Sequence, residues 1–475
     1  MIACRYAVEG AGYAPVGNRE ILVAEGRIAV LRDGAGGRLL ALPAPANAHD
    51  HARAVRTSAF GAMGRPLEAW LHMQALMPSV DPYLAAAASF GRSALGGAGS
   101  VMVHYTRAMG FSPLPEEAAS VARAAADVGV RIGFAVAMRD RNALSYGRDE
   151  AVLAALPEPA RAAIAAKFIR PAVPVAEQIA LVAAVAAAAE GPLVNVQYGP
   201  VGVQWCSEPL LEAVAEASAA SGRRVHMHLL ETRYQREWAD REYPGGIVKR
   251  LGELGLLSPR LTLAHCTWAR PEELEAIAAS GAVISVNTGS NFSLRSGIAP
   301  MAEMVRRGCR VAIGLDGATL DEDDDWLSEL RLAHVLHRGW GFERAVGDAA
   351  LLRAAFANGR FSVTGAEGGV IEPGADADLL LLDWERLDED LLGTDLPPVT
   401  LLLARARARH IHALIVAGRS VVREGVVLGI DHSAVTEELR GQLRAGLRGQ
   451  DALREALGHL ECVLSREYGG PAWCC

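Results

Sequence analysis

Short apolar runs and longer amphipathic, alanine-rich segments alternate through the middle of the chain. The apolar runs have the length of buried strands, and the alanine-rich segments have the length of helices. Strand-like runs lie at 39–43, 100–105, 131–136, 193–197, 224–228, 261–265, 283–286 and 311–315, and helical segments between them include 116–128, 177–190, 209–220 and 271–280. This alternation predicts an α/β protein whose parallel strands close into a (β/α)8 TIM barrel. No Gly-x-Gly-x-x-Gly motif opens a helix after a strand, which argues against a dinucleotide-binding fold.

The two ends of the chain do not follow this alternation. Residues 1–43 and 371–430 carry short strand-like runs separated by Gly and Asp turns. We expect them to pair into one small β-sandwich domain beside a catalytic barrel of residues 44–370. The C-terminal helical extension, 431–475, is amphipathic, which favours packing or contact within a homodimer or higher homo-oligomer over a role in chemistry.

Composition and charge narrow the class of protein. The chain has 475 residues, of which 51% are hydrophobic and 21% charged, with a net charge of -8. An acidic protein lacks the basic face that non-specific nucleic-acid binding needs, and the longest apolar run, 179–189, is too short to cross a bilayer. The first residues show no secretory signal, and the seven cysteines have no metal-type spacing. These features predict a cytoplasmic protein in a reducing compartment.

Residues suited to metal binding and proton transfer follow several of the predicted strands. His49 and His51 are separated by one residue, and alternate residues of a strand point to the same side, so the two imidazoles project together as zinc ligands do. Three later strands also end in such residues: His228 with Glu231 after it, His265, and Asp316. In a barrel of this type the carboxyl ends of the strands carry the active site. The pattern therefore predicts a metal centre at that end.

Taken together, these motifs resemble the amidohydrolase superfamily, in its branch of cytosine-, guanine- and triazine-type deaminases and aminohydrolases. The matching pieces are Asn47-Ala48-His49-Asp50-His51, His228-Leu229-Leu230-Glu231-Thr232, Ala264-His265-Cys266, Ser290-Asn291 through Ser296-Gly297-Ile298-Ala299-Pro300, Gly314-Leu315-Asp316-Gly317 and Pro373-Gly374-Ala375-Asp376-Ala377-Asp378-Leu379. They stand in family order from about residue 40 to 425. The resemblance covers most of the chain.

The resemblance implies one divalent metal, Zn²⁺ or alternatively Fe²⁺. By position its ligands are His49, His51, His228 and Asp316. A metal-bound hydroxide is then expected to attack a carbon of an amino-substituted N-heterocycle (a purine, pterin, pyrimidine or triazine) and release ammonia.

The same resemblance assigns the catalytic roles. Glu231 shuttles the proton, Asp316 accepts one from the attacking water, and His265 hydrogen-bonds the water or the developing oxyanion. An alternative keeps this mononuclear site but hydrolyses a cyclic amide or removes another ring substituent.

Contacts to a small heterocyclic substrate are expected from polar and aromatic residues near the strand ends. These candidates are Gln197, Gln204, Trp70, His104 and Asn291, with Glu68 beside Trp70 in a segment that resembles a pocket wall of the triazine and guanine enzymes. Amide and aromatic groups suit a flat ring that offers hydrogen-bonding edges.

Other polar groups near these motifs are expected to be structural. His226 is expected to point away from His228, and Asp50 away from the metal. The acidic run 321–325 is expected to cap a helix. Lys167 is the one candidate for a carboxylated lysine that would bridge a second metal, but a single metal is favoured.

Overall fold

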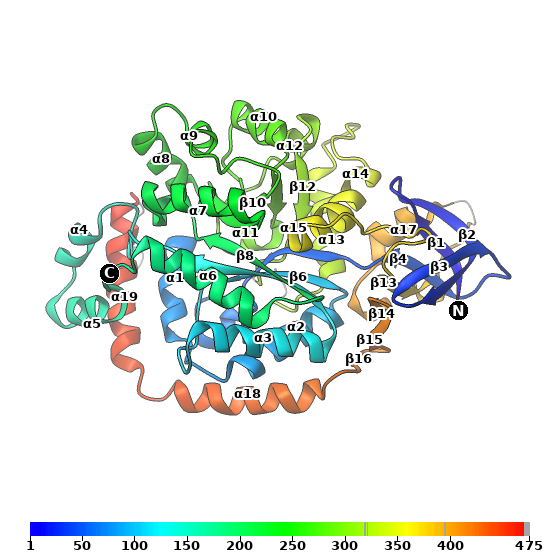
Figure 1. Ribbon diagram of the computed structural model, residues 1–475, viewed down its shortest axis with the longest axis horizontal. Helices are drawn as coiled ribbons and strands as arrows, with labels where there is room; N and C mark the ends of the chain where they lie inside the picture. Colours follow the sequence, from blue (N-terminus) through cyan, green and yellow to red (C-terminus); the bar gives the residue numbers. More distant parts are fainter. Residues whose placement is uncertain (318–319, 321, 394–395, 470–475) are drawn as a thin grey trace.

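Eight parallel strands form the central sheet in the computed structural model of the protein (Figure 1). The structure describes residues 1–317, 320, 322–393 and 396–469. In order around the sheet the strands are β5 (Ala46–Asp50), β6 (Ser100–Tyr105), β7 (Arg131–Met138), β8 (Val194–Pro200), β9 (Val225–Leu229), β10 (Leu261–His265), β11 (Val283–Val286) and β12 (Arg310–Ile313). The predicted TIM barrel is confirmed, but its first strand is β5 and not the run 39–43, which lies in the second sheet.

Helices surround the barrel and separate its strands in the sequence. They are α2 (Pro82–Leu95), α3 (Leu114–Val128), α6 (Val175–Ala189), α7 (Glu208–Ser221), α8 (Arg233–Glu242), α9 (Ile247–Glu253), α10 (Pro271–Ser280), α11 (Thr288–Ser293), α12 (Met301–Arg306), α13 (Trp326–His337) and α14 (Asp348–Arg353). The strands are buried on both sides, which explains their near-continuous apolar sequences.

A short helix, α15 (Gly359–Thr364), covers the amino-terminal end of the barrel. Gly359 lies so close to the start of β5 that an added Cβ would be 2.8 Å from the carbonyl oxygen of Ala46. The opposite end, where the strands finish, is thereby left as the open mouth.

The two chain ends form a second sheet beside the barrel, as the sequence predicts. Its strand order is β16-β15-β14-β13-β4-β1-β2-β3, so hydrogen bonds join all the strands into one continuous sheet. The strands are β1 (Ile2–Glu9), β2 (Ala14–Ala24), β3 (Arg27–Asp33), β4 (Leu39–Pro43), β13 (Leu379–Asp383), β14 (Ile411–Val416), β15 (Arg419–Arg423) and β16 (Val426–Val427). Two helices, α16 (Trp384–Leu387) and α17 (Pro398–Arg405), lie between β13 and β14 in the sequence.

The C-terminal helices run back along the barrel. Helix α18 (His432–Gly446) packs on α2, and α19 (Asp451–Glu467) packs on α1 (Leu67–Met73), α4 (Asp149–Ala154) and α5 (Glu158–Phe168) (Figure 1). Apolar side chains of α19, among them Leu457 and Leu460, belong to one buried cluster with residues of α1 and α5. The C-terminal segment therefore returns to the elements around the barrel mouth.

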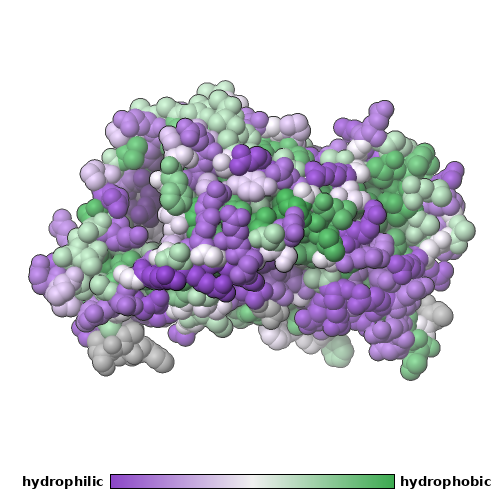
Figure 2. Space-filling model, turned by 90° about the horizontal axis from the view of Figure 1, so that it is seen from below, coloured by the Kyte–Doolittle hydropathy of each residue, from purple (hydrophilic) through white to green (hydrophobic). Residues whose placement is uncertain are grey.

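Seen from the side of α18, hydrophilic residues predominate on the surface, with apolar ones between them (Figure 2). Among the described residues, no helix combines the length and the apolar character needed to cross a membrane. The homo-oligomeric state and the cytoplasmic location stay predictions.

Candidate metal centre and active-site pocket

His49 and His51 project from the end of β5 toward Asp316. The Nε2 atoms of His49 and His51 lie 3.5 and 3.1 Å from Asp316 Oδ1. His51 Nδ1 lies 2.8 Å from the carbonyl oxygen of His104, which fixes the proton on that nitrogen and leaves Nε2 as the lone-pair atom. Both imidazoles therefore direct a possible ligand atom at the same carboxylate oxygen.

His228 completes the histidine group from the end of β9. Its Nδ1 lies 2.6 Å from the carbonyl oxygen of Val201, so its Nε2 is again the free nitrogen. Its ring centroid is 4.7 Å from that of His49. Burial and the neighbouring imidazoles lower the pKa values of His49 and His228 well below the ordinary value, which keeps both rings neutral, the form that binds metal.

Asp316 follows β12 in the left-handed backbone conformation, with φ of 57°. Non-glycine residues adopt this region rarely and often at functional sites. Its Oδ2 accepts a hydrogen bond of 2.5 Å from Ser290. Burial alone would raise the pKa of Asp316, but the adjacent imidazole of His51 and the positive charge of Arg53 lower it below its ordinary range. Asp316 is therefore a carboxylate at neutral pH.

Glu231 and His265 lie on the other side of Asp316. His265 Nε2 is 3.7 Å from Glu231 Oε2 and 4.0 Å from Asp316 Oδ2. Burial and the negative charge of Asp316 raise the pKa of Glu231 well above its ordinary value. A carboxyl that keeps its proton beside an ionised one is the arrangement that general acid catalysis requires.

The ring of His265 is held by two asparagines. Its Nδ1 lies 2.9 Å from Asn291 Oδ1 and 3.2 Å from Asn287 Nδ2, so each of its tautomers has a partner.

The donor atoms fit a divalent metal. Nitrogen or oxygen atoms of His49, His51 and Asp316 lie within 4.8 Å of one another, as do those of His49, His228 and His265. His49 Nε2 and Asp316 Oδ1 are buried and have no hydrogen-bond partner among the described residues. Three imidazoles and one carboxylate around a buried point are a usual zinc or iron donor set.

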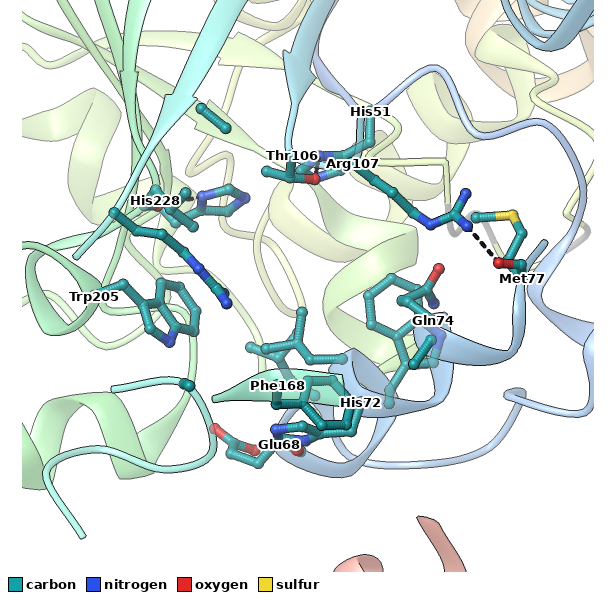
Figure 3. A pocket seen from close by; sticks show the side chains of 18 of the residues that line it. His51, Glu68, His72, Gln74, Met77, Thr106, Arg107, Phe168, Trp205 and His228 are labelled. Atoms are coloured by element: carbon teal, nitrogen blue, oxygen red, sulfur yellow. Dashed lines mark hydrogen bonds between the residues drawn. The ribbon is translucent and has the colours of Figure 1, made fainter. Parts of the chain in front are cut away.

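A cavity of about 430 Å³ opens onto this group. In Figure 3, His228 and His51 lie at one side and Glu68, His72 and Phe168 lie across from them. The aromatic residues of its wall are Trp70, Tyr105, Tyr146, Phe168, Trp205 and Tyr468. The cavity therefore offers flat apolar surfaces close to the metal-binding side chains.

Glu68 is a buried carboxyl in the cavity wall. Its Oε1 accepts hydrogen bonds from Tyr146 OH at 3.0 Å and Thr232 Oγ1 at 2.6 Å. Its Oε2 has no hydrogen-bond partner among the described residues, and burial raises its pKa. This oxygen is therefore a buried acceptor beside the cavity, without a partner in the part of the chain that the structure describes.

The expected substrate contacts need correction. Trp70 lines the cavity, but four others are not among the residues that form its wall: Gln197, Gln204, His104 and Asn291. Gln197 faces the closed end of the barrel, where its amide donates to the carbonyl oxygens of Ser362 and Val363 at 3.1 Å each. Trp205, next to Gln204, lines the cavity in its place. A position close to the end of a strand in the sequence does not specify the depth of the side chain in the barrel.

His226 was expected to face away from His228, and this prediction is wrong. Residues two apart on a strand share a side, so both point into the barrel. His226 Nε2 lies 2.8 Å from His49 Nδ1.

The remaining alternatives are placed as follows. Asp50 is buried and accepts hydrogen bonds from Asn47 and from the amides of His51 and Ala52. Lys167 is exposed and lies at the cavity wall. In the acidic run, Asp321 lies outside the described residues, and Asp325 caps α13 by accepting from the amides of Leu327 and Ser328.

Sequence reasoning missed Arg53 and Tyr468. The Arg53 guanidinium is 3.7 Å from Asp316 Oδ1 and lies over the ring of Trp70 at 4.7 Å. Its place just after the histidine pair could have revealed it. Tyr468 lines the cavity from the end of α19, and its hydroxyl accepts a hydrogen bond of 3.3 Å from the amide of Tyr146. No local pattern links residue 468 to the site.

Comparisons with known proteins show which family the sequence matches and which relatives it resembles. The sequence profile of the amidohydrolase family matches residues 40–421. The chain is 30% identical over 246 residues to a 5'-deoxyadenosine deaminase of Methanopyrus kandleri, covering 52% of this chain and 56% of that protein. It is 34% identical over 237 residues to a 5-methylthioadenosine/S-adenosylhomocysteine deaminase of Pyrococcus horikoshii, covering 50% and 55%. The chain thus matches little more than half the length of these curated relatives.

Solved structures share the fold over almost the whole chain. An adenosine deaminase from Xanthomonas campestris with bound zinc has a TM-score of 0.77 at 21% identity, covering 94% of this chain and 98% of that one. A variant of the Arthrobacter aurescens atrazine chlorohydrolase, complexed with zinc and atraton, has a TM-score of 0.77 at 20% identity, covering 93% and 98%.

Proposed function

Since the chain belongs to the amidohydrolase family, we propose that it is a metal-dependent deaminase that replaces the exocyclic amine of an N-heterocycle by oxygen. One observation carries the proposal. The free nitrogens of His49 and His228 and the ionised Asp316 converge beside the buried Glu231, whose pKa is raised, at the base of a cavity with aromatic walls.

The metal is proposed to be Zn²⁺, with Fe²⁺ as the alternative, held by His49, His51, His228 and Asp316. When bound, such an ion acts as a Lewis acid and lowers the pKa of a coordinated water. The relatives solved with zinc support this choice.

The protein side chains then handle the protons. Asp316 takes a proton from the attacking water, and Glu231 donates its proton to the ring nitrogen next to the reacting carbon. His265 hydrogen-bonds the oxygen as charge develops on it. The leaving amine takes up the proton held by Asp316 and departs as ammonia, while Glu231 regains a proton from the hydroxyl on the same carbon, so that water and the aminated ring become the ring carbonyl and ammonia.

We further propose an adenine nucleoside as the substrate. The similarity to deaminases of 5'-deoxyadenosine and 5-methylthioadenosine supports a purine. Trp70, Trp205 and Phe168 offer faces for a flat ring. The carboxyl of Glu68, in the cavity wall, would accept a hydrogen bond from a ribose hydroxyl.

The test is ammonia release by the zinc-loaded protein from a panel of adenosine, 5'-deoxyadenosine, guanine, cytosine, a pterin and an aminotriazine. We expect release from the adenine nucleosides in the wild type and none in Asp316→Asn. Asp33→Asn, a surface change with 93% of its side chain exposed, serves as the control. Release from none of the panel, with hydrolysis of a cyclic amide by the same preparation, would establish the alternative reaction instead.

A further inference from the structure

Three buried histidines continue from the metal centre into the barrel. His49 Nδ1 and His226 Nε2 are 2.8 Å apart, and their rings are nearly parallel at 17°. The ring of His104 stands at 89° to that of His226, with centroids 5.6 Å apart. His104 Nε2 in turn lies 3.0 Å from the carbonyl oxygen of Gly199. All three imidazoles have 0% relative exposure, so water does not compete for their nitrogens.

His104, the histidine of this group that lies farthest from the metal centre, can carry its proton on only one of its two ring nitrogens. A carbonyl oxygen can only accept, so His104 must carry its proton on Nε2, and its Nδ1 must be a lone pair. That Nδ1 is buried and has no hydrogen-bond partner among the described residues. The imidazole of His104 can come this close to the backbone only because residue 199 is a glycine: a Cβ on Gly199 would be 2.9 Å from His104 Nε2.

For His49, the histidine at the metal centre, only one position of the ring proton is compatible with metal binding. His49 can offer Nε2 as a ligand only if its proton is on Nδ1, which then donates to His226 Nε2. His226 must therefore carry its own proton on Nδ1. This Nδ1 likewise has no hydrogen-bond partner in the described parts of the chain.

His104 lies beside His226, with ring centroids 5.6 Å apart, but no hydrogen bond joins the two rings, because Nδ1 of each has no partner among the described residues. In the reverse assignment at His49, His226 would donate to His49, which would put a proton on the ligand nitrogen of His49. Acceptance by His226 Nε2 is therefore the arrangement that leaves His49 Nε2 free for a metal.

We propose that His226 is a positioning residue that forms an imidazole relay with His49, which fixes the tautomer and ring orientation of His49 and so sets the metal affinity of the site. His104, held by the carbonyl oxygen of Gly199, packs beside the ring of His226. The relay rests on the proposed metal site but not on the nature of the substrate.

Zinc affinity of the purified full-length chain tests the relay. The protein is stripped with a chelator and titrated with zinc against a chromophoric competitor. Loss of a ligand's hydrogen-bonding partner typically weakens binding about 10–100-fold, and we expect a loss in that range for His226→Leu. His226→Gln keeps an oxygen that can accept from His49 Nδ1 and should recover part of the lost affinity.

The matched control is His410→Leu, which removes a buried histidine that bonds the amide of Arg407 in the second sheet region. It should bind zinc as the wild type does. Wild-type affinity in His226→Leu would overturn the relay. A wild type that binds no zinc would instead overturn the proposed metal site.

A second measurement does not depend on how the variants fold. Neutron diffraction from the zinc-loaded wild type should place deuterium on Nδ1 of His49 and of His226 and on Nε2 of His104. Deuterium on His226 Nε2 would overturn the relay.

Discussion

The backbone amide of Asp316 donates a hydrogen bond of 2.8 Å to the carbonyl oxygen of His49. This bond connects the segment after β12 to β5, the last barrel strand to the first. Nearby, the amide of Leu315 donates to Asn47 Oδ1, also at 2.8 Å. Two proposed metal ligands are therefore joined by the same contacts that close the barrel, so a change that disturbs closure should also disturb the metal site.

Gly314→Ala tests this link. A Cβ at this position would be 2.4 Å from Asn287 Oδ1 and 2.8 Å from the amide nitrogen of His49. One of these two neighbours is a backbone atom, which cannot rotate aside as a side chain can. We therefore expect a loss of about 1–3 kcal/mol in the free energy of unfolding, together with weaker zinc binding. Urea denaturation and zinc titration measure the two effects. The control is Gly441→Ala in α18, where nothing lies within 4 Å. Its stability should stay equal or rise, and unchanged zinc affinity in Gly314→Ala would contradict the link.

Glu231→Gln separates proton transfer from metal binding. The amide preserves the shape of the side chain and can still accept from Ser296 Oγ, which lies 3.2 Å from Oε1. Because the variant cannot donate or take up the proton, we expect kcat to fall about 10²–10⁴-fold. Zinc content, measured by elemental analysis, should match the wild type. Loss of zinc would mean that Glu231 is itself a ligand, and the proposed roles would have to change.

Tyr468 should affect substrate binding although it lies at the end of the C-terminal helix. Its ring packs at 5.6 Å from that of Tyr146, which donates to Glu68. In Tyr468→Ala the cavity loses part of its wall, and we expect KM to rise about tenfold with a smaller change in kcat.

Tyr468→Phe keeps the ring and should have a KM closer to the wild type. Tyr83→Ala, in α2 and outside the cavity wall, is the control. Steady-state kinetics on the best substrate of the panel supply the measurement. A fall in kcat at constant KM would argue against contact with the substrate.

Glu329 should give stability a defined dependence on pH. It lies buried in α13, accepts from the amide of Gly289 at 2.8 Å, and burial raises its pKa from 4.5 to about 7. The folded protein therefore holds this proton more tightly than the unfolded chain. The stabilisation from the proton is fully present below pH 4.5 and is lost as the pH rises through 7.

Relative to Glu329→Gln, the wild type should lose up to about 3 kcal/mol of stability over this range. Chemical denaturation of both proteins at several pH values measures the difference. An exposed change, Glu216→Gln, should follow the wild type at every pH. Parallel pH profiles for wild type and Glu329→Gln would refute the role of Glu329.

The barrel and the metal-binding group could be predicted because their signals are local. Strand and helix periodicity is visible within a few residues, and His49, His51 and His228 each follow an apolar run. How deep a side chain lies in the barrel could not be predicted from the position of the residue along its strand. Gln197 is three residues before the end of β8 and bonds α15 at the closed end, whereas Trp205, beyond the strand, lines the cavity.

The sequence by itself determined the order of strands and helices, the family resemblance and the residues suited to bind a metal, because these follow from residue type and short-range spacing. Only the tertiary structure decided that His226 bonds His49, that His104 lies off the cavity wall, and that Tyr468 lies on it. Each of these depends on contacts between segments far apart in the chain. Such contacts are set by barrel closure and by the packing of α19, which no local pattern encodes.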